Sequence, residues 1–386
     1  MKFTIQRDLL ISSLQNVMKA ISPRTVIPIL TGIKVEASHN GITLTGSNSD
    51  ISIESFIPAE EEEKVNVEHI EEGSIVLHAK YFPEIIRKLP EDIVSIEVDS
   101  SLKTVIRSGK AEFNLNGQDA EEYPLLPKIQ TDDTFEMPVN VLKNMIKQTV
   151  FAVSTMETRP ILTGVNMRLA NNRLHFVATD SHRLASREVD IQDAAVQFEN
   201  VVVPGKSLHE LNKMLSDTDE LIQISVTNNQ ILFRTKNINF LSRLLDGNYP
   251  ETDRLIPTQS KTKIKMKTKE LLHTIDRASL LAKDEKNNVV RLSTEGNMIE
   301  ISSNSPEIGN VVENISAISM EGEELKISFS SKYVMDALRA IEYDEITIDF
   351  TGAMRPFIIR PVEDDSILPR SSYLSDDKSF SLLLQL

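Results

Sequence analysis

The chain repeats itself. PILTG at residues 28–32 returns as PILTG at residues 160–164, which is 132 residues later. The same spacing relates Phe3 to Phe135 and relates Asn48-Ser49 to Asp180-Ser181. A fainter third copy follows after a further 124 residues, where Asn288-Val289 matches Gly164-Val165 and Asn304-Ser305 matches Asp180-Ser181. Units of about 130 residues can each bury a core of their own, unlike solenoid repeats of ~20–45 residues. The repeat therefore predicts three copies of one domain.

Each copy contains two amphipathic helices among short strands in which apolar and polar residues alternate. One helix follows the opening strand of each copy, and we expect the other at residues 81–89, 207–215 and 331–341. This order indicates an α+β fold in which two helices pack on antiparallel sheet. The expected domains are residues 1–127, 128–257 and 258–386, and the third ends in a divergent C-terminal tail.

Charge is distributed unevenly along the chain. The formal net charge is -15, yet the six expected helices carry about twice as many basic as acidic residues, and each holds at least two basic ones. Solvated helix surfaces explain this for any single helix. All six together favour a basic surface that faces the phosphates of duplex DNA. Contacts of that kind position DNA without reading its sequence.

Signals for catalysis, metal binding and membranes are missing from the sequence. There is no Cys, the seven His form no metal-spaced pair, and no phosphate-binding or nucleophile motif occurs. We therefore expect no cofactor, no metal and no enzymatic activity, although an enzyme whose carboxylates meet only in the fold is an open alternative. No run approaches the ~18 apolar residues of a membrane span, and the N-terminus lacks a signal peptide, so we expect a cytoplasmic protein.

Several longer motifs resemble those of one family. They are SPRT at 22–25, PILTG at 28–32, FNLN at 113–116, ETRPILTG at 157–164, ATDSHRLA at 178–185, FLSRLLDGNYP at 240–250, DRASLL at 276–281 and SPEIG at 305–309. Together they resemble the β subunit of bacterial DNA polymerase III, the sliding clamp of DNA replication, in its Gram-positive form. The resemblance runs from Met1 to about Arg360. It implies three DNA-clamp domains and a head-to-tail homodimer that forms a ring around double-stranded DNA as a processivity factor.

The resemblance also implies a hydrophobic pocket between the second and third domains. There the replicative polymerase, the clamp loader, and mismatch-repair and translesion proteins would dock motifs of the Gln-Leu-x-Leu-Phe type. The matching positions are Leu162, Thr179, Ser181, His182, Arg183, Leu184, Pro250, Arg254, Leu255 and Pro356. A structural turn around His182, and ordinary core positions for the three leucines, are the alternatives.

Further assignments follow from the same resemblance. The DNA contacts of the family correspond to Arg24, Lys80, Lys110, Arg159 and Lys206. At the dimer interface, Phe113 and Leu115 of one chain would meet Leu280 and Leu281 of the other, although each also suits a core. An interaction scaffold of clamp ancestry that no longer encircles DNA is the competing function.

The C-terminus departs from the family pattern. The residues from Asp364 to Pro369 look shortened, and a tail covers residues 370–386. The tail could be disordered, could supply a strand through Leu382 to Leu386, or could fold into the pocket as a self-ligand. We favour a strand or disorder.

Overall fold

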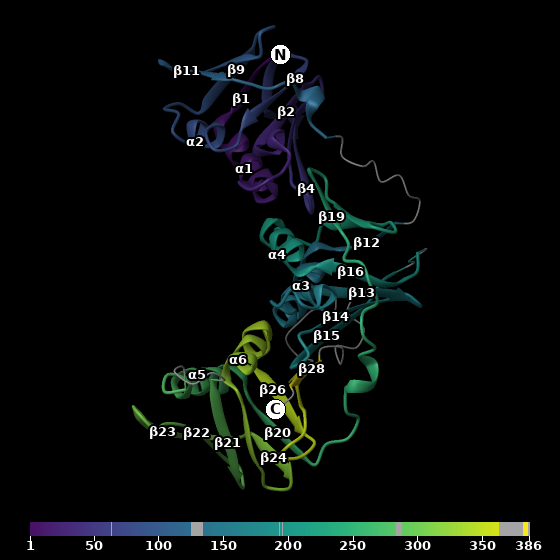
Figure 1. The fold of residues 1–386 in the computed structure, drawn as a ribbon, viewed down its shortest axis with the longest axis vertical. Coiled ribbons are helices and arrows are strands. Elements are labelled where there is room, and N and C mark those ends of the chain that lie inside the picture. Colours follow the sequence, from purple (N-terminus) through teal and green to yellow (C-terminus); the bar gives the residue numbers. More distant parts are fainter. Residues whose placement is uncertain are drawn as a thin grey trace. The chain divides into compact units, whose positions relative to one another are not determined.

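The computed structural model describes residues 1–62, 64–124, 134–192, 194, 196–282, 288–362 and 381–384 (Figure 1). Two compact units make up the chain. Unit 1 contains Met1–Val139 and Lys213–Leu244, and unit 2 contains Asn140–Asn212 and Leu245–Leu386. The domain boundary expected after residue 127 lies outside the described residues.

Unit 1 is built on two antiparallel sheets and a small ribbon. The five-stranded sheet has the order β11 (Ala111–Asn116), β10 (Lys103–Ser108), β9 (Ile93–Val98), β1 (Lys2–Gln6) and β7 (Val67–Glu71). The eight-stranded sheet has the order β12 (Thr134–Pro138), β17 (Leu221–Val226), β18 (Gln230–Arg234), β19 (Ile238–Arg243), β4 (Ile51–Pro58), β3 (Gly41–Ser47), β2 (Gly32–Ser38) and β8 (Gly73–His78). The ribbon pairs β5 (Glu60–Glu61) with β6 (Lys64–Val65).

Unit 2 has two antiparallel sheets of its own. The nine-stranded sheet has the order β16 (Phe198–Pro204), β13 (Gly164–Ala170), β14 (Arg173–Thr179), β15 (Arg183–Asp190), β28 (Ser381–Leu384), β27 (Phe357–Val362), β26 (Glu345–Phe350), β20 (Thr262–Lys267) and β24 (Ser319–Gly322). The four-stranded sheet has the order β23 (Gly309–Ser316), β22 (Met298–Ser305), β21 (Val289–Glu295) and β25 (Lys326–Ser330).

Two helices belong to each copy of the repeat, as expected. They are α1 (Arg7–Val17) and α2 (Phe82–Arg87), α3 (Val139–Thr149) and α4 (Gly205–Met214), and α5 (Thr268–Ser279) and α6 (Ser331–Ala340). Short 3-10 turns cover Met18–Ala20, Pro28–Thr31, Ala120–Glu122, Val150–Ala152, Pro160–Thr163 and Asp253–Leu255. Helices α1 and α2 lie side by side, and α1 packs on β3 and β4; α5 and α6 form a similar pair (Figure 1). No helix in the described part of the chain is long and apolar enough to cross a membrane.

The repeated PILTG motif forms the same structure in both copies. Its proline opens a 3-10 turn, and its leucine is buried as Leu30 or Leu162. The threonine hydroxyl donates to the proline carbonyl, over 2.8 Å in the first copy and 2.7 Å in the second. The glycine allows the neighbouring side chain to approach the backbone closely, because a Cβ on Gly32 would lie 2.4 Å from the Val76 side chain. The proline, the leucine, the threonine and the glycine of the motif thus each have a local structural role.

Strand pairing confirms the three copies and corrects one spacing. In the first hairpin Ser38 pairs with Gly41, and 132 residues later Ala170 pairs with Arg173. In the third copy Glu295 pairs with Met298, which gives a spacing of 125 residues from the second copy. The spacing of 124 residues predicted from the sequence is wrong by one, because dipeptides such as Asn-Ser and Asp-Ser carry no information about the strand register that fixes their positions.

Neighbouring copies join by pairing edge strands. Strand β4 of the first copy pairs with β19 of the second, and we call this pairing the first seam. Strand β15 of the second copy pairs with β28 of the third, and we call it the second seam. By position in their copies, β4, β15 and β23 are equivalent, and so are β11, β19 and β28. The middle copy thus gives strands to a sheet in each unit, which explains why its residues are divided between the two units.

The end of the tail is a strand, one of the alternatives left by the sequence. Ser381–Leu384 pairs with β15 on one side and with β27 on the other, and all four residues are buried. Leu383 joins a buried cluster that includes Leu162 and Leu184. Residues 370–380, 385 and 386, which make up the rest of the tail, and residues 363–369 before it lie outside the described residues.

Replacing Leu383 by alanine should therefore destabilise unit 2. Loss of a leucine that is 2 % exposed costs about 2–5 kcal/mol in the free energy of unfolding. Urea unfolding followed by circular dichroism, with hydrogen exchange of the β15 and β27 amides, measures this loss. Leu221→Ala is the control, because Leu221 is 48 % exposed. If the two variants unfold alike, β28 does not hold this position in solution.

Candidate functional site

An apolar cluster lies at the second seam, where the sequence places the peptide pocket. Its buried members are Leu162, Val177, Leu184, Val202, Tyr249, Ile358 and Leu383, and Ile161, Leu245 and Ile256 pack against them. The cluster thus unites side chains from the 3-10 turn at Pro160–Thr163, from the strands β14, β15, β16, β27 and β28, and from the segment that follows β19. Burial raises the pKa of the Tyr249 hydroxyl, which accepts a hydrogen bond of 2.9 Å from the Thr179 amide.

The turn between β14 and β15 is fixed by Asp180. One carboxylate oxygen accepts the amides of His182 and Arg183 at 2.9 and 3.0 Å. Ser181 in this turn has a φ of 76°. In the first copy the Asn48 side chain accepts the amides of Asp50 and Ile51 in the same way. The turn is therefore common to the two copies, and what differs is the side chains that it presents.

Arg183 is buried beneath this turn. Its side chain is 5 % exposed, and its guanidinium donates to an Asp180 carboxylate oxygen at 3.1 Å, to an Asp336 carboxylate oxygen at 2.9 Å and to the Phe151 carbonyl at 2.6 Å. The guanidinium carbon also lies 4.6 Å from the centre of the Tyr333 ring. A buried cation is tolerated here because each of its three nitrogens donates a hydrogen bond. The guanidinium thus links β15 to helix α6.

The other expected pocket residues surround the cluster. His182 is exposed, and its ring stacks on Tyr333 with centroids 6.2 Å apart. Leu255 is 46 % exposed, and Ser181, Pro250 and Arg254 are exposed as well. Pro356 is half-buried, and its carbonyl accepts the Thr351 hydroxyl at 2.7 Å. Leu162 and Leu184 are buried in the cluster, and we call Pro250, Leu255 and Pro356, which are exposed or half-buried, the rim.

Several members of the cluster were not anticipated from the sequence. Ile256 and Ile358 lie in none of the motifs quoted above, Leu245 lies in one of them without being singled out, and Val177 and Val202 are ordinary inward positions of alternating strands. Tyr249 could have been found, because Tyr123 is its counterpart in the first copy and both are buried before a proline.

A polar network holds the rim segment to the sheet. The Arg168 guanidinium donates to the Asp253 carboxylate at 3.0 Å, and Asp253 begins the 3-10 turn that carries Leu255. Arg168 also lies 3.3 Å from Nδ1 of His175, whose Nε2 lies 2.7 Å from the Ser186 hydroxyl. A guanidinium can only donate, so Nδ1 accepts and the His175 ring is neutral. Burial lowers the pKa of His175, and the Glu188 carboxylate opposes this shift.

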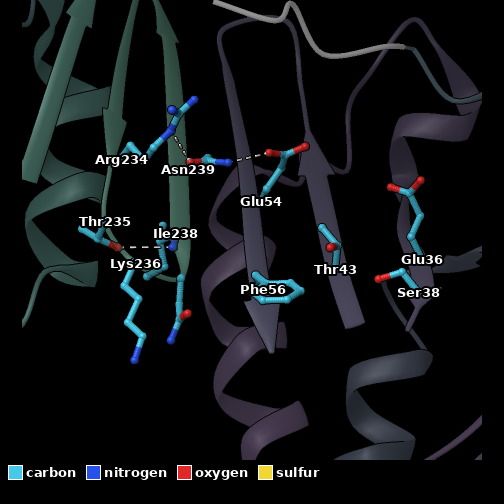
Figure 2. Close-up of a pocket in the computed structure, with 11 residues that line it drawn as sticks. Glu36, Ser38, Thr43, Glu54, Phe56, Arg234, Thr235, Lys236, Ile238 and Asn239 are labelled. Atoms are coloured by element: carbon cyan, nitrogen blue, oxygen red, sulfur yellow. Dashed lines mark hydrogen bonds between the residues drawn. The ribbon is translucent and has the colours of Figure 1, made fainter. Parts of the chain in front are cut away.

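A depression of about 530 Å³ lies on unit 1 at the first seam (Figure 2). Acidic Glu36 and Glu54 lie on the strands of the first copy, and Arg234 and Lys236 come from the second copy. Asn239 bridges the seam, because its side chain donates to Glu54 at 2.9 Å and accepts from Arg234 at 3.2 Å. Since Lys236 pairs with Glu61, these charges mainly join the two copies.

The five expected DNA contacts are all exposed. Arg24, Lys80, Lys110, Arg159 and Lys206 form no ion pair with any described residue. Lys80 lies 5.3 Å from the centre of the Tyr81 ring. Other basic helix residues are paired within the chain, including Arg7 with Asp92 at 3.0 Å and Lys147 with Glu342 at 2.5 Å.

Two of the expected dimer residues lie in unit 1, and the other two lie in unit 2. Phe113, which is 38 % exposed, and half-buried Leu115 lie on β11, an outer strand of the five-stranded sheet. Leu280, which is 58 % exposed, caps the C-terminal end of α5, and half-buried Leu281 follows it.

Family models and similar proteins both identify the same family. Models of the DNA polymerase III beta subunit match its N-terminal domain at residues 1–127, its central domain at 136–251 and its C-terminal domain at 253–373. The beta sliding clamp of Bacillus subtilis is 59 % identical over 369 residues, which cover 95 % of this chain and 98 % of the relative. That of Staphylococcus epidermidis (strain RP62A) is 52 % identical over 377 residues, which cover 97 % and 100 %.

Solved structures agree with this. The DNA polymerase sliding clamp from Bacillus subtilis is similar at a TM-score of 0.93 and 56 % identity, covering 100 % of this chain and 98 % of that one. The DNA polymerase III beta chain from Streptococcus pneumoniae is similar at a TM-score of 0.91 and 38 % identity, with the same coverage.

The lowered pKa of His175 makes a prediction about acid stability. The unfolded chain, with a histidine pKa near 6.5, binds a proton at a higher pH than the folded chain does. The free energy of unfolding should therefore fall as the pH drops below about 6.5. His175→Gln should lose less stability than the wild type between about pH 7 and pH 5 in urea titrations. His39→Gln, at a side chain that is 81 % exposed, is the control and should behave as the wild type. An unchanged pH dependence in His175→Gln would contradict the assignment.

Proposed function

The chain belongs to the DNA polymerase III β subunit family, the bacterial sliding clamps, and on this premise we propose that it encircles duplex DNA as a homodimer and tethers the replicative polymerase. Its three domains span residues 1–127, 128–257 and 258–386. It carries out no reaction of its own in the cytoplasm, because a topological tether increases processivity without chemistry.

The observation that carries this proposal is the pair of strand edges left open. Each seam joins an edge of the β4 type to an edge of the β19 type, and two such seams are closed within the chain. The remaining edge of each type is β23 in the third copy and β11 in the first, and neither is covered by another described strand. Exposed edges of this length pair readily with another chain. Two chains that pair β11 with β23 head to tail, and whose rotation closes, form a ring.

The seams also predict the register of this third pairing. Phe240 pairs with Ile53 at the first seam and Leu382 pairs with Ala185 at the second. The equivalent residues on the open edges are Phe113 and Val311, because Phe113 has the ladder position of Phe240 and Val311 has that of Ala185. Phe240 and Leu382 are fully buried, whereas Phe113 is 38 % exposed. We therefore assign Phe113 and Leu115 to a dimer interface opposite β23 and the Leu280-Leu281 end of α5 of the other chain.

The lysines at the second helix of each copy support a contact with DNA phosphates. Lys80, Lys206 and Lys332 are exposed at equivalent positions, at or just before the first turn of α2, α4 and α6. A threefold repeat of one cation suits a sequence-independent contact with the DNA backbone. Arg24, Lys110 and Arg159 are further candidates on exposed loops.

The cluster at the second seam is the proposed partner site. A peptide of the Gln-Leu-x-Leu-Phe type would place its hydrophobic residues over Leu162 and Leu184 and against the rim residues Pro250, Leu255 and Pro356. Thr179 and Ser181 hold the turn, and Arg254 and His182 offer polar contacts. Arg183 supports the site without contacting the peptide, because its buried ion pairs hold β15 against α6. Polymerase, clamp loader, mismatch-repair and translesion proteins are the proposed partners.

The affinity of the chain for a partner peptide tests whether the rim residues bind it. Leu255→Ala should weaken binding of a fluorescent peptide containing Gln-Leu-Ser-Leu-Phe by about ten-fold, because an apolar contact of roughly 1.4 kcal/mol is lost. Leu255 is half exposed, so the variant should fold. Leu221→Ala removes a comparably exposed leucine from unit 1 and should bind as the wild type. If Leu255→Ala and the wild type bind the peptide with equal affinity in fluorescence anisotropy, the rim does not contact the peptide.

A disulfide tests the ring and its register. The chain has no native Cys, so engineered cysteines cross-link without competition. Asn114→Cys combined with Asn310→Cys should give a covalent dimer on a non-reducing gel, since residues directly opposite in an antiparallel pair suit a disulfide. Asn114→Cys combined with Val312→Cys shifts the register by two residues and should cross-link poorly.

Retention on DNA separates a ring from a scaffold. Rings that are loaded on circular plasmid by a bacterial clamp loader and then oxidised should stay bound in high salt and leave when the plasmid is linearised. Equal retention on circular and linear DNA would mean that the chain does not encircle it, and failure to dimerise would favour the scaffold function.

A further inference from the structure

A cavity of about 180 Å³ lies on unit 1 at the first seam. It is separate in composition from the depression of Figure 2, since the two share no lining residue. Its floor includes Leu30 and Leu241, and Asp50, Gln230 and Arg243 contribute to its walls. None of the expected site residues lines it.

The cavity has the same position at the first seam as the proposed partner site has at the second. Ser52 pairs with Leu241 across β4 and β19, as Leu184 pairs with Leu383 across β15 and β28. Below it, Leu30 and Tyr123 belong to one buried cluster. Their counterparts Leu162 and Tyr249 form the floor of the partner site. Equivalent residues thus lie at the cavity of the first seam and at the proposed partner site of the second.

The side chains around the cavity at the first seam are more polar than those at the proposed partner site. Ser52 stands where the second seam has Leu184, and its hydroxyl lies 2.6 Å from the Ser47 hydroxyl. Asp50 stands where the second seam has His182, and Gln230 has the ladder position of Pro356. With its small volume and a polar wall, the cavity suits one aliphatic side chain on Leu30 and Leu241 rather than several hydrophobic residues in a row.

One cation at the cavity lacks a partner. The Arg243 side chain is exposed and forms no ion pair or side-chain hydrogen bond with any described residue. Its backbone amide donates to the Asp50 carbonyl at 2.9 Å, which fixes the residue at the wall. A guanidinium in this position binds a carboxylate through two parallel hydrogen bonds. Asp50 beside it disfavours ligands that carry several negative charges.

We infer that this cavity is a second peptide-recognition site, which takes a segment with one aliphatic residue next to one acidic residue. The aliphatic side chain packs on Leu30 and Leu241, and the carboxylate binds Arg243. Ser52 and Gln230 provide polar contacts for the peptide backbone. The site goes beyond the proposed function, and it needs neither DNA nor ring closure to bind.

A minimal probe tests this site directly. N-acetyl-leucyl-aspartyl-amide is titrated into the full chain labelled with carbon-13 at its isoleucine and leucine methyl groups. The methyl resonances of Leu30, Leu241 and Ile27 should shift in a saturable way. Binding of N-acetyl-leucyl-asparaginyl-amide, which lacks the carboxylate, should be at least about five-fold weaker.

Substitutions test whether the carboxylate of the probe binds Arg243 specifically. Arg243→Gln should weaken the acidic probe about five-fold and leave the asparaginyl probe unchanged. Arg291→Gln, at an exposed arginine of unit 2, should have no effect. The methyl spectrum of each variant reports its folding. Shifts confined to Leu162 and Leu383, no shift at millimolar probe, or equal affinity for both probes would each overturn the inference. The readout does not depend on DNA retention, so its failure is distinct from a failure of the clamp function.

Discussion

Hydrogen bonding between edge strands is the interaction on which the rest of this structure depends. Every copy has two edges of different type, and an unpaired edge leaves a row of backbone groups without partners. Pairing β4 with β19 and β15 with β28 satisfies four of these edges and extends the sheets across the copies. Among the described strands, the middle copy has no edge of the β4 type or of the β19 type left, although β12 and β16 are sheet edges of another kind, whereas the first and third copies each have one. The same rule that builds the chain therefore specifies how a second chain would add to it, because the open edges have the geometry of the closed ones.

The two seams share a backbone and differ in what they bury. At the second seam Arg183 lies below the turn, and three acceptors and an aromatic ring offset the cost of removing its charge from water. At the first seam Ile51 has that position, and Ser52 replaces the leucine that follows. A buried apolar cluster results in one case, and a cavity with a more polar lining results in the other. Divergence of a few side chains on a repeated scaffold is thus sufficient to give the two seams different chemistry.

The electrostatic asymmetry of the chain is real but smaller than a count of helix charges suggests. Arg7, Lys147 and Arg277 lie on helices, yet each pairs with a carboxylate, so their charges are partly compensated within the chain. Lysines at the start of the second helices have no such partner among the described residues, and they recur in all three copies. A contact with phosphates that ignores sequence needs this regular spacing more than it needs a large net charge.

Patterns in the sequence were sufficient to predict the three copies, the two helices in each and the α+β class. These follow from identical motifs and apolar periodicity, which are properties of short segments of chain. The burial of Arg183, the place of Leu383 in the cluster beside Leu162, and the offset of 125 residues for the third copy became known from the folded chain alone. The folded chain also revealed the contact between Arg168 and Asp253, which are far apart in the sequence. Burial and pairing of this kind depend on which distant strands meet, and a local pattern carries no information about that because the same alternation fits any neighbour.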